Sequence, residues 1–308
     1  ENNFMGKGVK LDTQITLGEG TVKGQVIYSQ PNWNYTDNTV FTSLTSTSED
    51  YMSDFGYKTN TTGFSFGTTF EQYENLYFSP SIEAEVETLD TTADASANLI
   101  KQEGNFADLN FNYLLDYDLR NQRYQTSDGF RNTFSQEIPI ISKNKEITNS
   151  IQSSIYHKLS PTSDMVAKAT IALKTVNTLS DKDVRISKRL YIPQGKLRGF
   201  EAGKVGPVDK NNYIGGNHFS TLNLSSTLPT ILPSLENFDV SIFFDAANIW
   251  GVDYDNSIND SSKIRSSAGV ALDVFTPIGP LSFSLSQAIT KKQTDRTETF
   301  RFNLGTTF

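Results

Sequence analysis

Cysteine is absent from the 308-residue chain, which excludes both a disulfide framework and a thiolate metal site. No stretch of the sequence approaches the roughly 18 consecutive apolar residues that a membrane-spanning helix needs. A transmembrane β-barrel is not excluded, because each of its strands needs only about ten residues with one lipid-facing side. The 35 acidic and 27 basic residues give a net charge of −8, which argues against a nucleic-acid-binding surface.

Alternation of apolar and polar residues runs through almost the whole chain. In "PLSFSLS", for example, Leu281, Phe283 and Leu285 share one face of an extended chain and three serines share the other. We count about fourteen segments of this kind, with boundaries uncertain by a few residues. They span residues 7–18, 20–30, 38–48, 60–71, 75–89, 106–118, 130–141, 147–158, 165–176, 214–228, 237–249, 263–275, 278–289 and 297–308. The pattern predicts an all-β, antiparallel protein.

The spacers between these segments alternate in length. Short turns at 71–75, 160–164 and 276–279 interleave with longer loops at 49–59, 90–105, 177–213, 250–262 and 290–296, and 119–129 is a long connection where a short one is due. Short turns on one rim and long loops on the other are typical of an outer-membrane meander barrel. No linker or charge block divides the chain, so we expect residues 1–308 to form a single domain.

A β-sandwich is the alternative fold for such a strand pattern. Aromatic residues near strand ends favour the barrel, in which they form girdles at the two membrane interfaces. The candidate girdle residues are Tyr57, Phe64, Phe66, Phe70, Tyr113, Tyr117, Trp250 and Phe308.

Several sequence blocks in the C-terminal part carry a family resemblance. "LRGF" at 197–200, "VGP" at 205–207, "GGN" at 215–217, "FFDAANIW" at 243–250 and "FRFNLGTTF" at 300–308 occur in this order. Together they resemble the barrel of the BamA family, the outer-membrane insertases, densely over 185–308 and more loosely before it. The resemblance implies a sixteen-stranded barrel, of which this chain would hold about fourteen strands, and a loop at 177–213 that folds into the lumen.

The resemblance assigns the tip of that loop to Arg198, Gly199 and Phe200, followed by Gly206 and Pro207. A loop packed against a barrel wall needs glycine where backbone approaches backbone, and an arginine can hold it through an inward carboxylate. Asp245 is out of register with the apolar residues of its segment, so we expect it to point inward and to bind Arg198. Where the family usually has a second acidic residue, we assign Ser225, and Arg198 is left with one carboxylate partner.

The last segment is implied to be one side of a lateral gate between the first and last strands. Phe300, Phe302, Leu304 and Phe308 are predicted to share one face, and Gly305 would allow the strand to bend. At the other end, "NNFMGKG" resembles the turn before the family's third strand. The first two strands and the periplasmic POTRA repeats are therefore expected to be missing from this chain.

Catalytic chemistry is not indicated. His157 and His218 are the only histidines and fit neither a nucleophile triad nor a zinc site, so we expect them on the surface or in the lumen. Glu83, Glu85 and Glu87 share one strand face about 7 Å apart, too far to share one ion, and are expected to form a solvated lumen wall. The sequence predicts no enzyme activity, no cofactor and no metal.

The implied function is the folding and insertion of outer-membrane β-barrel clients at the seam of the barrel, without ATP. The implied partners are unfolded clients, periplasmic chaperones, accessory outer-membrane lipoproteins and the lipid bilayer, and the implied location is the bacterial outer membrane. A TamA-like or two-partner-secretion transporter shares the Arg-Gly-Phe loop and stays an alternative. A passive porin and, third, an outer-membrane enzyme remain open as well.

Overall fold

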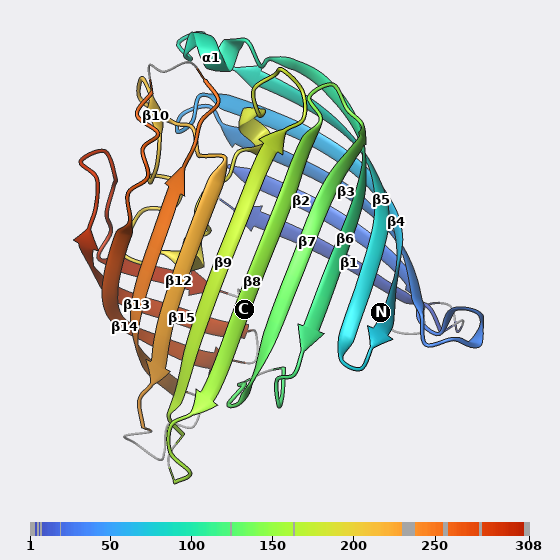
Figure 1. Cartoon of the computed structure of the whole chain (residues 1–308), viewed down its shortest axis with the longest axis vertical. Coiled ribbons are helices and arrows are strands. Elements are labelled where there is room, and N and C mark those ends of the chain that lie inside the picture. The colour runs from blue at the N-terminus through green and yellow to red at the C-terminus, as the bar shows by residue number, and fades with distance from the viewer. Residues whose placement is uncertain are drawn as a thin grey trace.

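The computed structural model of the chain describes residues 4, 6, 8–18, 20–123, 125–162, 164–229, 238–254, 258–276 and 279–304. Fourteen strands form one antiparallel sheet in which each strand pairs with the next one along the chain, so the topology is a meander. Figure 1 shows this sheet curved into a barrel wall: the green and yellow strands lie in front, and the first strands (blue) and last strands (red) lie behind them. Among the described residues, no helix is both long and apolar enough to cross a membrane.

The strands and helices have the following bounds. The main sheet consists of β1 (Lys10–Gly18), β2 (Thr21–Gln30), β3 (Thr39–Tyr51), β4 (Tyr57–Tyr73), β5 (Leu76–Thr91), β6 (Gly104–Asp118), β7 (Gly129–Ile141), β8 (Glu146–Lys158), β9 (Val166–Thr178), β12 (His218–Thr227), β13 (Phe238–Trp250), β14 (Arg265–Thr276), β15 (Gly279–Thr290) and β16 (Phe300–Leu304). The connections hold the short pair β10 (Val208–Asp209) and β11 (Asn212–Tyr213), the helix α1 (Ala97–Ile100) and the 3-10 turns η1 (Trp33–Tyr35), η2 (Ile186–Lys188) and η3 (Gln194–Lys196).

The two faces of the strands have opposite character. On β15, Leu285 is 59% exposed on the outer face while Ser284 and Ser286 are buried on the inner face. On β9 the outward Ile171 is likewise 59% exposed and the inward Thr170 is buried. Large apolar residues on the outside and polar residues on the inside are the pattern of a barrel whose outer surface meets lipid. This arrangement excludes the β-sandwich, in which the apolar face would be core.

Aromatic residues form a ladder on the outer face of β4 to β7, near the short-turn rim. Phe70 contacts Phe78 edge to face, Phe78 contacts Tyr113 in a tilted arrangement and Tyr113 contacts Phe134 edge to face, with ring centroids 5.6 to 5.9 Å apart. One candidate girdle residue was assigned wrongly: Tyr57 is only 3% exposed and packs inward. Phe308 lies outside the described residues.

The strand segments predicted from the sequence correspond one to one with the fourteen strands, and the long connection at 119–129 is confirmed between β6 and β7. The expected long loop at 49–59 is wrong. It is only five residues long, because β3 runs on to Tyr51 and β4 begins at Tyr57.

The largest connection, residues 179–217 between β9 and β12, is called here the lumen loop. Its apolar residues, among them Leu197, Phe200 and Val205, pack against inward residues of β9, β12 and β13. A second cluster joins Ile186, Ile214 and other loop residues to the rim of β4, β5 and β6. The buried apolar core of this barrel therefore lies where the lumen loop meets the inner wall.

Candidate functional site

The backbone of the lumen loop is irregular, so its polar groups need partners other than a strand ladder. The barrel wall and rim provide several of them. The amide of Ile186 donates to the side chain of Gln102 at 2.6 Å, and the amide of Val184 donates to Asp253 at 2.7 Å. A bridge between Leu190 and Gly216 joins the first half of the loop to its C-terminal end. The loop is thus a defined structure with specific contacts to the wall.

Arg185 anchors the start of the lumen loop. Its guanidinium lies 2.8 Å from Glu146 and 2.5 Å from Asp108, with Glu87 at 3.5 Å, and it stacks over the ring of Phe106. These three carboxylates come from β8, β6 and β5, and all are buried. Burial opposes the charge of Arg185, but the carboxylates outweigh burial and raise the pKa of its guanidinium.

Lys188, three residues further along the loop, binds the same wall. Its ammonium lies 3.1 Å from Glu85 and 3.6 Å from Glu137. The acidic row of β5 was therefore interpreted wrongly as a solvated wall, since Glu87 is 3% exposed and Glu85 pairs with a loop lysine. Each carboxylate has its own partner, because the spacing along one strand face keeps the carboxylates apart.

Arg198 anchors the tip of the loop on the opposite wall. Its Nε and Nη2 donate to the two carboxylate oxygens of Asp245 at 2.7 and 2.8 Å, and its backbone amide donates to the same carboxylate at 3.1 Å. The guanidinium stacks on Phe243, 3.4 Å from the ring centroid. Asp245 is fully buried, and the bidentate geometry is the strong form of an arginine–carboxylate contact.

The second partner of Asp245 is Asn223, not a residue at 225. The strands β12 and β13 pair Asn223 with Asp245 directly, and the Asn223 amide donates to Asp245 and to the Lys196 carbonyl at 2.8 Å each. Ser225 pairs with Phe243 instead. The position that completes the anchor therefore carries an amide, and within the described part of the chain Arg198 has one carboxylate partner.

Gly199 lies flat against the inner faces of β14 and β15. Its φ is +89°, and a Cβ there would come within 3.1 Å of the Cβ of Ser267 and 3.3 Å of the hydroxyl of Ser286. The Ser267 hydroxyl donates to the carbonyl of Arg198. The inward residues near the tip on these two strands are small, which leaves room for it; they are Ser267, Gly269, Ala271, Ser284 and Ser286. Close packing and the positive φ both require glycine.

The rest of the motif is packed in a similar way. Phe200 is 1% exposed and belongs to the apolar cluster between the loop and the wall. Gly206 has a φ of +122°, and a Cβ there would meet Ile249 at 2.9 Å. The carbonyl of Pro207 accepts the amide of Ile214 at 3.1 Å, which folds the end of the loop back on itself.

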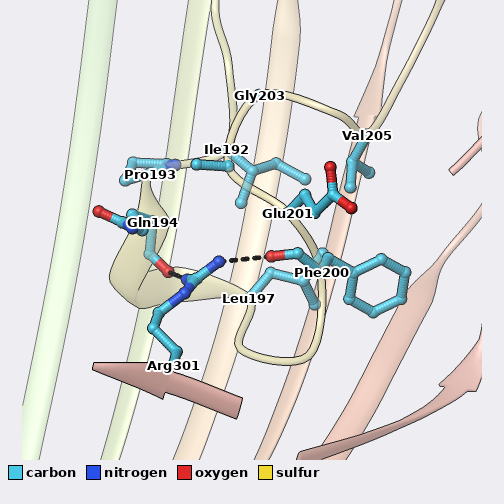
Figure 2. A pocket seen from close by; sticks show the side chains of 10 residues that line it. Ile192, Pro193, Gln194, Leu197, Phe200, Glu201, Gly203, Val205 and Arg301 are labelled. Atoms are coloured by element: carbon cyan, nitrogen blue, oxygen red, sulfur yellow. Dashed lines mark hydrogen bonds between the residues drawn. The ribbon is translucent and has the colours of Figure 1, made fainter. Parts of the chain in front are cut away.

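The tip of the loop also contacts the last strand. Figure 2 shows Arg301 of β16 beneath a small pocket of the loop, donating to the carbonyls of Gln194 and Phe200 at 2.5 Å each. Phe300 and Phe302 point outward and are 56% and 49% exposed. Leu304 is the last residue of β16 and pairs with Leu281 of β15. Gly305 and Phe308 lie outside the described residues.

Sequence reasoning did not find Phe243, Asn223, Arg185 or Arg301. Phe243 had a usable signal, since it lies two residues before Asp245 and therefore on the same inner face. The others are single polar residues in alternating strands or in a loop without periodicity. The histidines lie apart from the site: His157 is exposed beside Asp128, and His218 packs on Trp250.

Comparison with known proteins agrees with the BamA-family resemblance of the sequence. The model of the Omp85 superfamily domain matches residues 3–308. Outer membrane protein assembly factor BamA of Neisseria meningitidis serogroup B is 30% identical over 143 residues, which are 37% of this chain and 18% of that protein. BamA of Neorickettsia risticii is 26% identical over 132 residues, 42% of this chain and 18% of that protein. The matched parts are thus less than a fifth of these relatives' lengths.

Solved structures agree on the fold. BamA from Haemophilus ducreyi lacking POTRA domains 1–3 superimposes with a TM-score of 0.87 at 23% identity, over 98% of this chain and 65% of that one. CdiB from Acinetobacter baumannii gives a TM-score of 0.57 at 12% identity, over 97% of this chain and 53% of that one. The chain belongs to the Omp85 superfamily, and its fold is a BamA-like β-barrel of the outer membrane.

Proposed function

We propose that this chain is the barrel of an outer-membrane protein insertase, which folds and inserts β-barrel clients through a lateral gate between the first and last strands. The observation that carries the proposal is the position of β16. It ends the sheet order, and in the part of the chain that the structure describes it pairs only with β15. A strand edge with free amide and carbonyl groups can pair with an incoming strand, so the client grows by β-augmentation.

In this proposal the gate residues are Phe300, Phe302, Leu304, Gly305 and Phe308. Outward aromatic side chains on β16 place an apolar surface beside the lipid at the seam. Pairing with a client exchanges one set of strand hydrogen bonds for another, so the process needs no ATP. Catalysis in the enzymatic sense is not proposed.

The lumen loop has a supporting role in the proposal. Arg198, Gly199, Phe200, Gly206 and Pro207 hold the loop against the wall through Asp245 and the small residues of β14 and β15. The loop occupies part of the lumen, which favours an insertase over a passive porin. A TamA-like or two-partner-secretion transporter would use the same fold with different cargo.

We further propose that the working protein has two more barrel strands and periplasmic POTRA repeats before this chain. The structure from Haemophilus ducreyi is described as BamA lacking POTRA domains 1–3, which supports this expectation. Proposed partners are unfolded clients, periplasmic chaperones, accessory lipoproteins and the surrounding bilayer.

The test is client insertion. The full-length protein in liposomes is mixed with an unfolded outer-membrane barrel, and protease protection of the client is followed over time beside empty liposomes. We expect faster insertion than in empty liposomes, and a lower rate with Arg198→Ala. Equal rates in both liposome samples, together with steady single-channel conductance, would contradict the insertase and favour a pore.

A further inference from the structure

The side chain of Arg301 connects the last strand to the lumen loop, separately from the backbone hydrogen bonds that pair β16 with β15. In β16 the residues alternate, with Phe300 and Phe302 outward and Arg301 inward, where its side chain is only 5% exposed. Its Nη1 donates to the carbonyl of Gln194 and its Nη2 to the carbonyl of Phe200, each at 2.5 Å. Figure 2 shows the guanidinium between these two carbonyls.

The two carbonyls bracket the Arg-Gly-Phe tip. Gln194 opens η3, four residues before Arg198, and Phe200 ends the motif. A guanidinium has several N–H donors in a fixed planar arrangement, so one side chain can bind both acceptors with defined geometry. Glu298, three residues before Arg301 and just ahead of β16, forms an ion pair with Arg301 and so orients the guanidinium.

The backbone before β16 is joined to the same stretch of the loop. Phe200 forms an isolated bridge with Thr297. The amide of Glu298 donates to the Gly199 carbonyl at 3.2 Å, and the amide of Glu201 donates to the Arg296 carbonyl at 3.1 Å. The loop tip and the segment that leads into β16 therefore form a small ladder of their own, inside the barrel.

The path from β13 to β16 thus has two routes. One is the strand ladder through β14 and β15. The other runs from Asp245 through Arg198 and the loop tip to Arg301. The second route adds side-chain and backbone contacts to the pairing of β16 with β15, so the loop tip helps to fix the position of the strand.

We propose that Arg301 is a positioning residue: it locks β16 to the Arg-Gly-Phe tip and so fixes the place and register of the strand edge that pairs with a client. An outward swing of β16 requires both carbonyl hydrogen bonds to break. The role in client pairing rests on the proposed function, whereas the locking of β16 does not.

The experiment measures the position of β16 directly. This chain has no cysteine, and any cysteine of the full-length protein outside it is replaced by serine. Spin labels are then attached at Phe302→Cys on β16 and Ile171→Cys on β9, both outward and exposed. The distance distribution between them is recorded for the full-length protein in lipid nanodiscs, with Arg301, Arg301→Lys or Arg301→Gln. Client insertion by the same variants without labels is measured in liposomes.

The matched control is Arg296→Gln. Arg296 is an exposed arginine five residues earlier whose backbone joins the ladder and whose side chain faces Tyr213, not Gln194 or Phe200. Its substitution removes the same charge and leaves both Arg301 hydrogen bonds in place. Heat-modifiability on a gel verifies that each variant is folded. Should Arg301→Gln fail to fold, Arg301→Lys, which keeps the charge but not the two-acceptor geometry, carries the comparison.

We expect a broader distance distribution for Arg301→Gln, an intermediate width for Arg301→Lys and the wild-type width for Arg296→Gln. Client insertion should slow by at least about tenfold in Arg301→Gln, because both hydrogen bonds from the charged guanidinium are lost and the loss of one is already worth about tenfold. A wild-type width in a folded Arg301→Gln variant overturns the lock, and a broader width with unchanged insertion overturns the role in client pairing. A wild-type protein that inserts no client overturns the proposed function, while the widths still decide whether Arg301 holds the strand.

Discussion

The substitution Asp245→Asn tests the central anchor of the lumen loop with almost no change of shape. Asp245 is fully buried and accepts hydrogen bonds from the Arg198 side chain, the Arg198 amide and Asn223. An asparagine keeps one acceptor oxygen but presents an amide nitrogen to one of these donors. Arg198 then keeps its charge without a counter-charge.

The expected magnitude follows from burial. Removing one partner of a buried ion pair costs roughly 3–5 kcal/mol. The Arg198 side chain is 19% exposed, so water screens part of the loss and we expect about 2–4 kcal/mol. This free energy corresponds to a roughly 30-fold to 1,000-fold rise in the population of molecules with the loop tip detached.

Limited trypsin digestion of the detergent-solubilised protein measures that population, because cleavage of a transiently opened segment follows the opening equilibrium. Arg198 in the tip and Lys196 and Lys204 beside it are the expected cleavage sites. Asp239→Asn is the control: it lies on the inner face of the same strand and faces Asp273 rather than the loop. Equal cleavage rates in wild type and Asp245→Asn, with unchanged heat-modifiability, would refute the reasoning.

Three further predictions concern the rest of the loop. Gly199→Ala should raise cleavage at Lys196 by roughly five- to thirtyfold, since the positive φ and the contact with Ser267 together cost about 1–2 kcal/mol; a wild-type rate would contradict the close packing. Arg185→Gln leaves three buried carboxylates without their cation and should lower the unfolding temperature in a heat-modifiability series, with a loss of about 3–5 kcal/mol, whereas an unchanged temperature would show that the anchor is dispensable. Burial alone would lower the pKa of the Lys188 ammonium, but the nearby carboxylates of Glu137 and Glu85 outweigh burial and raise that pKa. Its stabilisation is therefore complete below the unfolded value of about 10.4 and declines as pH rises through the higher folded value. The stability gap between wild type and Lys188→Met, measured by urea unfolding, should narrow above about pH 10, and a constant gap would contradict this sign.

The strands were predictable because their signal is local. A period of two on each segment states which residues share a face, and the same rule correctly placed Asp245 inward without knowledge of its neighbours. It could also have corrected Tyr57, which lies seven residues before Phe64 and so on the opposite face of β4. The alternation of faces along β4 therefore predicts the inward position of Tyr57, whereas its position near a strand end predicted an outward girdle residue.

The partners across strands were not predictable in the same way. Whether residue 223 or 225 meets Asp245 depends on the register of β12 against β13, and a shift of two residues preserves every inward and outward assignment. The Arg185 anchor is harder still, because its carboxylates come from three strands and each is only one more inward polar residue in its own segment. Such a site is defined by the curvature of the whole sheet, which brings the three strands around one loop residue, and it has no local signature.

The two anchors of the loop have a joint consequence. Arg185 and Lys188 bind carboxylates of β5 to β8, whereas Arg198 and Arg301 connect the tip to β13 and β16. Apolar packing alone would allow the loop several positions in the lumen, because it is not directional. Ion pairs with fixed geometry add little net stability, but they specify one position. The loop therefore has one defined position in the lumen, in which it connects β5 to β8 with β13 and β16.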